Sequence, residues 1–485
     1  MKRIIQITLF TFAAFFFTTS CKKTMDINKN PNYPDNAPIN MLLPSAELSF
    51  AGVLGGYMEL VGGMWCQHYT QNSSANQYNT TVNYTISNTS YQVFWSIPYI
   101  HALPDLKIVS KKALEEGADN YYMASEIMTC FIFHVLASWY ENIPYTEALM
   151  GDEQLNPKYD DGKSVNTALI KRMDAALEKA PAAIASKVPM GKKDLINGGD
   201  MNKWVQFGKS LKLMLLMLDF EANKQTIEKM LAEDNLLKSD CKMDVFIDRE
   251  NNSNPLYEND RRKLNTANNI AASATLLKYL EQNKDPRIEA FYEPNKEGKY
   301  FGLNQGDRPP LTTLNFLLIS LAKIEPQDPV YFISFADVCF LKAEAYAKLG
   351  KTDEAEAAYN NAVTSAFSRW GYDAVPFIAK GGVYAFNSKS TETMLKSILT
   401  QKWIASARCN AWSSYFDINR TGIPALGTKL VSEPGYVAGE LTPVIDSALN
   451  PDEYPRRMIY PKSSSENNSN APAPLPLTQK QWWHK

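Results

Sequence analysis

The chain has 485 residues, 45% of them hydrophobic and 21% charged, which is typical of a globular protein with a large core. Its 50 lysines and arginines are balanced by 52 acidic residues, giving a net charge of -2. This balance argues against a nucleic-acid-binding protein, for which a clustered basic excess is expected.

The first 20 residues have the pattern of a bacterial lipoprotein signal. Lys2 and Arg3 precede an apolar run over residues 4–17, and Ser20 precedes Cys21. The run is too short to cross a membrane comfortably and ends in small residues, as a processing site does. We therefore expect residues 1–20 to be removed and Cys21 to carry lipid. The alternatives are an ordinary signal peptide with a chance cysteine, or an uncleaved anchor.

The segment after Cys21 is polar and rich in Asn and Pro up to Pro38, which predicts an extended tether. We expect folding to begin near Pro44. Residues 21–43 are then a lipidated tether, and residues 44–485 form a single domain.

Apolar residues recur every three to four positions along most of this domain, which predicts a mainly α-helical fold. Pro98 and Pro104 are expected to kink or end a helix within residues 90–114. The helical blocks are residues 47–69, 120–140, 165–184, 203–220, 268–281, 335–349, 353–369 and 391–407. Long irregular segments separate them, at residues 72–89, 238–265, 287–313 and 422–476, and loops of this length are usually functional.

One helix pair has the pattern of a tetratricopeptide repeat. Small residues, aromatic residues and a turn glycine follow the spacing of that repeat in the set Ala343, Tyr346, Gly350, Ala355, Tyr359 and Ala362. A single repeat cannot bury its own faces, so other helices must cover it, and those before Phe220 are the expected partners.

Catalytic and metal-binding patterns are not found. The sequence has four histidines and neither an HExxH nor a GxSxG motif, so we expect no enzyme, no cofactor and no metal site. Five cysteines besides Cys21 are widely spaced, and we expect Cys130 and Cys339 to be buried free thiols. Glycosidase carboxylates leave no local signature, so a surface glycosidase stays an alternative.

Several segments in order resemble the SusD/RagB-like nutrient-binding outer-membrane lipoproteins. These are residues 27–32 after the lipid cysteine, 200–204 leading into 210–213, 401–404, 411–412 with 419–424, and 454–457 with 460–461. The chain departs from the pattern at Thr18, and at Asn410, where an acidic residue is expected. Arg420 in the fourth segment is interpreted as structural, capping carbonyl groups or pairing with Asp417.

The resemblance implies a fold in which tetratricopeptide-like helix pairs form a scaffold half, packed against a loop-rich half that binds the ligand. It also implies a cell-surface location at the outer membrane through the lipid anchor. A SusC-like TonB-dependent transporter is the implied partner, receiving oligosaccharides or, in some members, peptides. No nucleic acid is expected as a partner.

Aromatic residues on the long loops are the candidates for the ligand site, because sugar rings stack on flat side chains. Tyr78 and Tyr84 are favoured, since they stand in polar loop sequence where burial is harder to arrange. The other candidates are Trp65, His68, Tyr69, Trp95 and Tyr300. For Trp65, Tyr69 and Trp95, which lie on helical blocks, packing in the core is the competing interpretation.

The leading hypothesis is therefore a non-enzymatic surface lipoprotein that binds an oligosaccharide and delivers it to a transporter. The same scaffold binding peptides or another nutrient is the second hypothesis. A helical-repeat scaffold that assembles envelope proteins without a small ligand is the third.

Overall fold

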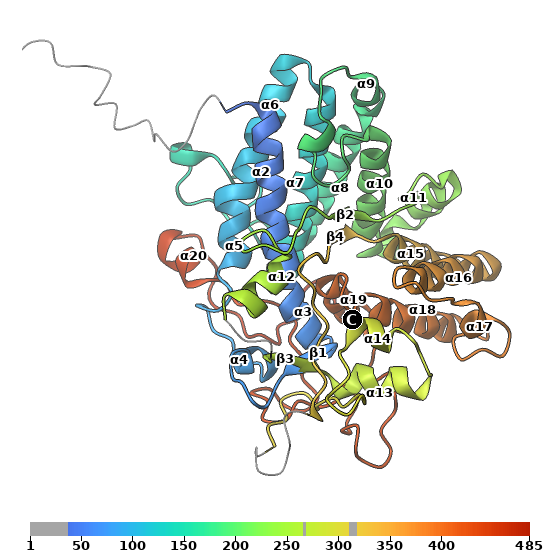
Figure 1. Ribbon diagram of the computed structural model, residues 1–485. Helices are drawn as coiled ribbons and strands as arrows, with labels where there is room; N and C mark the ends of the chain where they lie inside the picture. The colour runs from blue at the N-terminus through green and yellow to red at the C-terminus, as the bar shows by residue number, and fades with distance from the viewer. Residues whose placement is uncertain (1–36, 265–267, 310–317) are drawn as a thin grey trace, which may run out of the picture.

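A computed structural model describes residues 37–264, 268–309 and 318–485 (Figure 1). The predicted signal peptide, Cys21 and the tether up to residue 36 lie outside the described residues. Across the described ranges we find no helix whose length and hydropathy together would let it traverse a bilayer.

The fold is mainly helical, as predicted, with few and short strands. The first part of the chain holds α2 (Ile39–Val53), α3 (Glu59–Trp65), β1 (Tyr69–Gln71), α4 (Asn79–Val82), α5 (Val93–Ile97), α6 (Leu103–Glu116), α7 (Asp119–Tyr140), α8 (Gly162–Glu178), α9 (Ala180–Ala185), α10 (Met201–Met217) and α11 (Phe220–Glu233). The second part holds β2 (Cys241–Met243), α12 (Pro255–Tyr257), β3 (Ile270–Ala272), α13 (Ala274–Gln282), α14 (Ile288–Phe291), β4 (Val330–Ile333), α15 (Phe335–Lys348), α16 (Thr352–Ser368), α17 (Val375–Ile378), α18 (Thr391–Ala405), α19 (Ala411–Thr421) and α20 (Lys462–Asn467).

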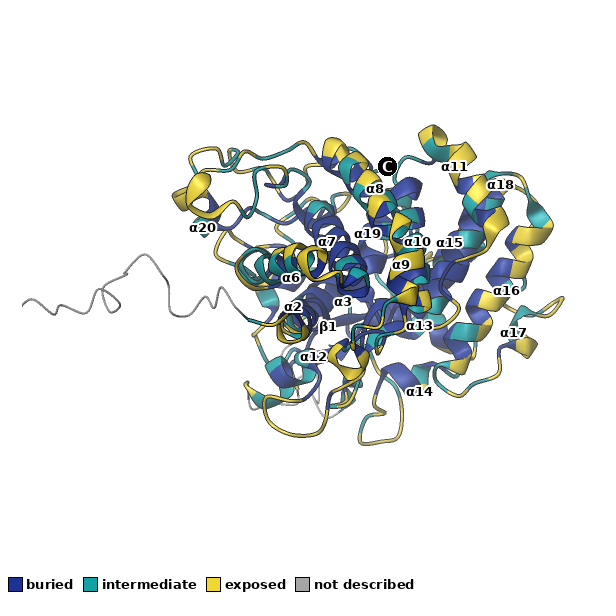
Figure 2. Ribbon diagram, turned by 90° about the horizontal axis from the view of Figure 1, so that it is seen from above, coloured by how far each residue is buried: buried dark blue, intermediate teal, exposed yellow. Residues whose placement is uncertain are grey.

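Helix α7 is the centre of the scaffold. It packs against α6, α8, α9 and α10, and Figure 2 shows it buried along almost its whole length, whereas α6, α8 and α9 each expose one side. A helix that is apolar on all sides must be enclosed in this way. The loops and the short strands β1 and β3 gather at the opposite end of the molecule from α9 (Figure 1).

Two small antiparallel sheets tie distant loops together. Strand β1 pairs with β3, with Tyr69 opposite Ala272, and β2 pairs with β4. Residues 268–281, predicted to be one helix, are therefore strand β3 followed by α13. The apolar run there is short and buried, so its periodicity did not distinguish a strand from a helix.

The chain at its prolines agrees only partly with the prediction. Helix α2 starts at Ile39, so Pro44 lies inside it and the folded body begins before residue 44. The α-helix α5 ends at Ile97, directly before Pro98, as predicted, but a π-helical turn over Pro98–Ala102 continues the helical path into α6. A proline inside a helical path lacks the N–H that would bond to the preceding turn, and the wider π-helical turn that begins at Pro98 carries the chain past this position.

Helices α15 and α16 form the predicted repeat pair, lying side by side in Figure 1. Ala343, Ala355 and Ala362 are fully buried, and such small side chains let the two backbones approach closely. Gly350 turns the chain between them with φ +75°, a conformation that favours glycine. The main partner of the pair is α18, which follows it in the chain, and α10 adds a smaller contact. The helices before Phe220 were predicted to cover the pair, and only the smaller contact, with α10, agrees with that prediction.

All five cysteines in the described part of the chain are free and buried, as predicted for Cys130 and Cys339. Burial raises the pKa of the Cys339 thiol to about 12 and that of Cys130 likewise to about 12. Such thiols stay protonated and pack as small apolar side chains.

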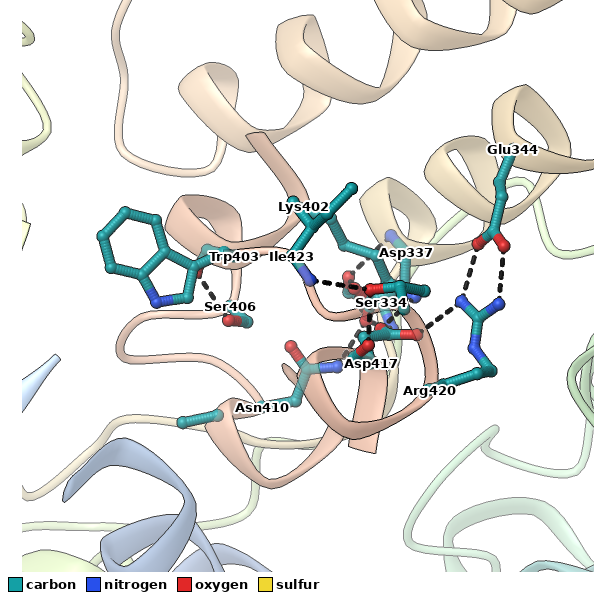
Figure 3. Close-up of polar contacts among 12 residues, drawn as sticks. Ser334, Asp337, Glu344, Lys402, Trp403, Ser406, Asn410, Asp417, Arg420 and Ile423 are labelled. Atoms are coloured by element: carbon teal, nitrogen blue, oxygen red, sulfur yellow. Dashed lines mark hydrogen bonds and ion pairs between the residues drawn. The ribbon is translucent and has the colours of Figure 1, made fainter. Parts of the chain in front are cut away.

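A buried ion network joins α15, α18 and α19 (Figure 3). Two guanidinium nitrogens of Arg420 donate to the carboxylate of Glu344, at 2.5 and 2.6 Å, and one also donates to Asp417 at 2.8 Å. Lys402 pairs with Asp417 at 2.6 Å. Burial opposes ionisation of Glu344, but the charges of Arg420 and of Lys348, which lies 2.9 Å away, outweigh this effect and hold the pKa of Glu344 well below its usual range. The structural interpretation of Arg420 is confirmed, although Glu344 is an additional partner.

Asn410 stands at the start of α19, where an acidic residue was expected. Its amide nitrogen donates to the carboxylate of Asp337 (Figure 3), which also accepts from the hydroxyl of Ser334 at 2.9 Å. An acid at position 410 would set two carboxylates against each other. The amide is therefore the compatible side chain in this chain.

Gly62 marks the close approach of α3 to α19. A Cβ at this position would lie 2.5 Å from the backbone nitrogen of Trp412, whereas a Cβ at Gly52 in α2 would meet nothing within 4 Å. We expect Gly62→Ala to destabilise the protein by about 1–3 kcal/mol through overpacking. Gly52→Ala is expected to stabilise it by about 0.5–1 kcal/mol, because alanine is the better helix former. Urea denaturation of the two variants checks this, and equal shifts would contradict the predicted contact.

Candidate functional site

Three of the predicted site residues lie in the core. Trp65 and His68 are fully buried, and Tyr69 is 1% exposed. The Trp65 ring packs against Trp139 and Tyr415, with centroids 6.0 and 5.0 Å apart. Burial lowers the pKa of His68 to about 3, so its imidazole is neutral. Trp65 and Tyr69 therefore pack in the core, as the competing interpretation stated, and His68 does so as well.

The expectation that Tyr78 and Tyr84 are exposed is wrong. They are 4% and 5% exposed. The Tyr78 hydroxyl donates to the carboxylate of Asp260 at 2.8 Å, and the Tyr84 ring packs edge-on against Trp65. Local polarity did not predict this burial, because Asp260 comes from a segment 182 residues further along the chain. Neither ring presents an open face to a ligand.

Trp95 and Tyr300 keep part of their surface accessible. They lie on different parts of the molecule, Trp95 on α5 and Tyr300 on the loop after α14. Phe301, next to Tyr300, is 44% exposed. The accessible candidates therefore belong to two separate surfaces, and the one at Trp95 contains a large hollow.

We call this hollow the Trp95 groove. It has a volume of about 800 Å³ and runs between α5 and α6, the loop over residues 144–159, and α20. These elements lie together at one side of the molecule in Figure 1, near α2. Trp95, Tyr99 and Tyr159 supply its aromatic surface.

The aromatic residues of the groove hold one another in place. Trp95 and Tyr159 are stacked, with centroids 5.8 Å apart and planes at 16°, and Tyr99 lies 4.9 Å from Trp95. Tyr140 packs edge-on against Trp95 at 5.0 Å. The Tyr99 hydroxyl donates to the carbonyl of Pro144 at 2.7 Å. The rings are therefore positioned before any ligand arrives.

The loop over residues 144–159 is tied down by Asp160. Its carboxylate accepts from the backbone nitrogens of Tyr145 and Thr146, at 3.1 and 2.7 Å. The backbone of Asp160 also pairs with Ile143, on the other side of the loop. This loop can form the wall of a stable groove because its path does not depend on a ligand.

The third wall, α20, is fastened to the same loop. The amide nitrogen of Asn468, just after α20, donates to the carbonyl of Pro157 at 2.7 Å. The Tyr159 hydroxyl also bonds to that of Ser464. At the start of α20, the backbone nitrogen of Lys462 donates to the carbonyl of Asn88 at 2.8 Å. Three segments that are far apart in the sequence thus form one groove.

The chemistry of the Trp95 groove suits the binding of a ligand that has both apolar faces and hydroxyl groups. Flat rings and aliphatic side chains make up most of its surface, and the hydroxyls and amides of Ser463, Ser464, Asn467 and Asn468 lie along α20. Among the described residues that line it there is no aspartate or glutamate, so it lacks the paired carboxylates of a glycosidase. Aromatic rings beside amides and hydroxyls are the groups that recognise the C–H faces and hydroxyls of a sugar.

A second cavity, of about 480 Å³, lies between α18 and the loops around residues 383–387 and 422–440. Two of its three tyrosines are closed to a ligand. Tyr359 and Tyr384 are 1% and 3% exposed, whereas Tyr279 is partly exposed and stacked on Tyr384. The Trp95 groove is therefore the better candidate for a ligand that stacks on aromatic rings.

Sequence analysis identified Trp95 but missed its neighbours. Tyr99 and Tyr159 stand in segments that carry no motif, and α20 falls within the long irregular segment near the end of the chain. No spacing connects α20 with Trp95, because the two lie near opposite ends of the sequence. The signal that the sequence did offer for α20 was the length of the irregular segment over residues 422–476, which contains it.

A preformed groove with aromatic rings, amides and hydroxyls on a helical scaffold has the features of a site that binds a ligand. The chain belongs to the SusD-like family: residues 54–461 match the family described as "Starch-binding associating with outer membrane". Membership places it among outer-membrane-associated proteins that bind nutrients and glycans. No curated protein matches the chain in sequence.

Solved structures of SusD homologues share the fold. One from Bacteroides uniformis is 22% identical with a TM-score of 0.76, covering 92% of this chain and 99% of its own. One from Bacteroides vulgatus is 18% identical with a TM-score of 0.72, covering 90% and 93%. A chitin-binding SusD homologue from Flavobacterium johnsoniae is 18% identical with a TM-score of 0.73, covering 90% and 98%.

Proposed function

We propose that this chain is a cell-surface lipoprotein, anchored at the outer membrane through Cys21, that binds an oligosaccharide in the Trp95 groove without cleaving it. It then delivers the oligosaccharide to a SusC-like TonB-dependent transporter. The observation that carries the proposal is the stacked pair of Trp95 and Tyr159 in a preformed groove, on a scaffold of the SusD-like family.

Thermal stabilisation of the purified protein, without its lipid anchor, tests the binding step. A ligand present at 100 times its dissociation constant adds about 2.7 kcal/mol of stability. The panel contains polysaccharides, oligosaccharides and peptides, with chitin oligosaccharides included because a SusD homologue of this fold binds chitin. We expect oligosaccharides to stabilise the protein. Release of reducing ends during the assay would instead establish a glycosidase.

Peptide binding is the second candidate function, and one feature of the groove favours it. Ile100, Met150 and Leu155 line the groove and are 56%, 39% and 69% exposed. Exposed aliphatic side chains suit the apolar side chains of a peptide better than the hydroxyls of a sugar. Stabilisation by peptides alone would select this function.

Replacing Cys21 by serine tests the anchor. The cysteine thiol is the proposed site of lipid attachment, and two or three acyl chains are needed to hold a protein stably on a membrane. We expect Cys21→Ser to move the protein from the membrane fraction to the soluble fraction after cell fractionation. Cys66→Ser is the matched control, since Cys66 is a buried thiol in the folded body. A Cys21→Ser protein that stays in the membrane fraction would contradict the lipid anchor.

Delivery to the transporter rests on the family resemblance. We expect the transporter to copurify with the full-length protein from detergent-solubilised membranes, and a strain lacking this gene to lose uptake of the ligand. Normal uptake in that strain would contradict the delivery step. Copurification without any stabilising nutrient would favour the envelope-scaffold hypothesis.

A further inference from the structure

The charged side chains that line the Trp95 groove are all of one sign. Lys107 and Lys111 of α6 are lining residues, and no aspartate or glutamate of the described ranges is. The chain as a whole carries a net charge of -2, so this local excess does not reflect a generally basic protein. Asp152 and Glu153, close in sequence to Gly151 of the groove, are exposed and do not line it.

Neither lysine is neutralised by a carboxylate. Within the described ranges Lys111 forms no ion pair or hydrogen bond. The Nζ of Lys107 donates to the backbone carbonyl of Leu149 at 2.5 Å, which fixes its position and leaves its charge uncompensated. The buried charges of the scaffold differ in this respect, since Arg420 is paired with Glu344. The two positive charges at the groove are therefore available to a ligand.

Their spacing allows them to act together. Residues four apart on a helix lie on the same face, about 6 Å apart along its axis. Because both side chains leave the helix on one face, their ammonium groups can reach the same anionic group. The aromatic surface of Trp95 and Tyr159 belongs to the same groove, so a sugar ring can stack there while its acidic substituent reaches the lysines.

We propose that the Trp95 groove selects anionic oligosaccharides, which carry carboxylate or sulfate groups, over neutral ones. This inference rests on the proposed function, since it names the class of oligosaccharide bound at the same site. The sugar ring stacks on the aromatic residues, and Lys107 and Lys111 bind the acidic group.

Isothermal titration of the purified protein tests this selectivity. The probes are a neutral oligosaccharide, one of the same length with uronic acid units, and one of the same length with sulfate groups. We expect at least one acidic probe to bind more tightly than the neutral one, with an affinity that falls as salt is raised. The two acidic probes distinguish carboxylate from sulfate as the preferred group.

The diagnostic variant is Lys111→Gln, because Lys107 also holds Leu149 and its removal would disturb the wall. We expect Lys111→Gln to lower the affinity for the acidic probe about tenfold, in line with a charge-assisted hydrogen bond. Its affinity for the neutral probe should not change, and Lys111→Arg should retain acidic binding. Lys229→Gln, at an exposed position of α11, is the matched control and should bind like the wild type.

Two outcomes would overturn the proposal in different ways. Equal affinity for neutral and acidic probes, unaffected by Lys111→Gln, would overturn the anionic selectivity and leave oligosaccharide binding in place. Binding of peptides but of none of the three oligosaccharides would overturn the proposed function, and the selectivity with it.

Discussion

Replacing Trp95 by alanine is expected to lower the affinity for the oligosaccharide about 30-fold or more. Trp95 is the centre of the aromatic surface, stacked on Tyr159 and in contact with Tyr99. Removal of a tryptophan at the centre of a binding site typically costs about 2 kcal/mol or more. Titration calorimetry of the variant against the wild type measures the loss.

The matched control for Trp95 is Tyr300→Ala. Tyr300 is a partly exposed aromatic residue on a separate surface, and sequence analysis gave it as a candidate as well. We expect Tyr300→Ala to bind like the wild type. Trp95→Phe, which keeps a ring that can stack, should retain most of the affinity and shows that the loss in Trp95→Ala is not a loss of fold. A large effect at Tyr300 with none at Trp95 would move the site to the loop after α14.

Replacing Arg420 by alanine is expected to destabilise the fold by about 3 kcal/mol, the lower end of the range for breaking a buried ion pair. The loss is not larger because Glu344 keeps Lys348 as a partner at 2.9 Å, and Asp417 keeps Lys402. Arg420 is buried, and its removal takes from Glu344 the partner that binds both carboxylate oxygens. The free energy of unfolding from urea denaturation measures the effect.

The control for Arg420 is a pair on the surface. Lys158 lies 3.7 Å from Glu147, and its side chain is 56% exposed. Exposed pairs contribute about 0–1 kcal/mol, so Lys158→Ala should change the free energy of unfolding little. A loss in Arg420→Ala no larger than in Lys158→Ala would show that the network of Figure 3 is not important for stability.

Local sequence patterns predicted the parts of the fold that depend on neighbouring residues. The periodicity over residues 120–140 corresponds to α7, and the spacing from Ala343 to Ala362 corresponds to the α15–α16 pair. Helical periodicity reports a buried face directly. It did not report which helix covers that face, and α18 was therefore missed as the main partner of the pair.

The candidate site depended on contacts that no local pattern contains. Tyr78 stood in polar sequence, but Asp260 supplies a partner for its hydroxyl and lets the ring be buried. The Trp95 groove is built by α6, the loop over residues 144–159 and α20, and its walls meet only in the folded chain. Trp95 was found because it is aromatic and near a long loop, while Lys107 and Lys111 had no distinguishing signal before the structure showed them without carboxylate partners.

The most direct test of the account is a crystal structure of the protein with the oligosaccharide that stabilises it most. We expect the ligand to lie in the Trp95 groove with a sugar ring stacked on Trp95 or Tyr159. A ligand bound at the Tyr300 surface, or in the second cavity beside α18, would contradict the central claim that the Trp95 groove is the binding site.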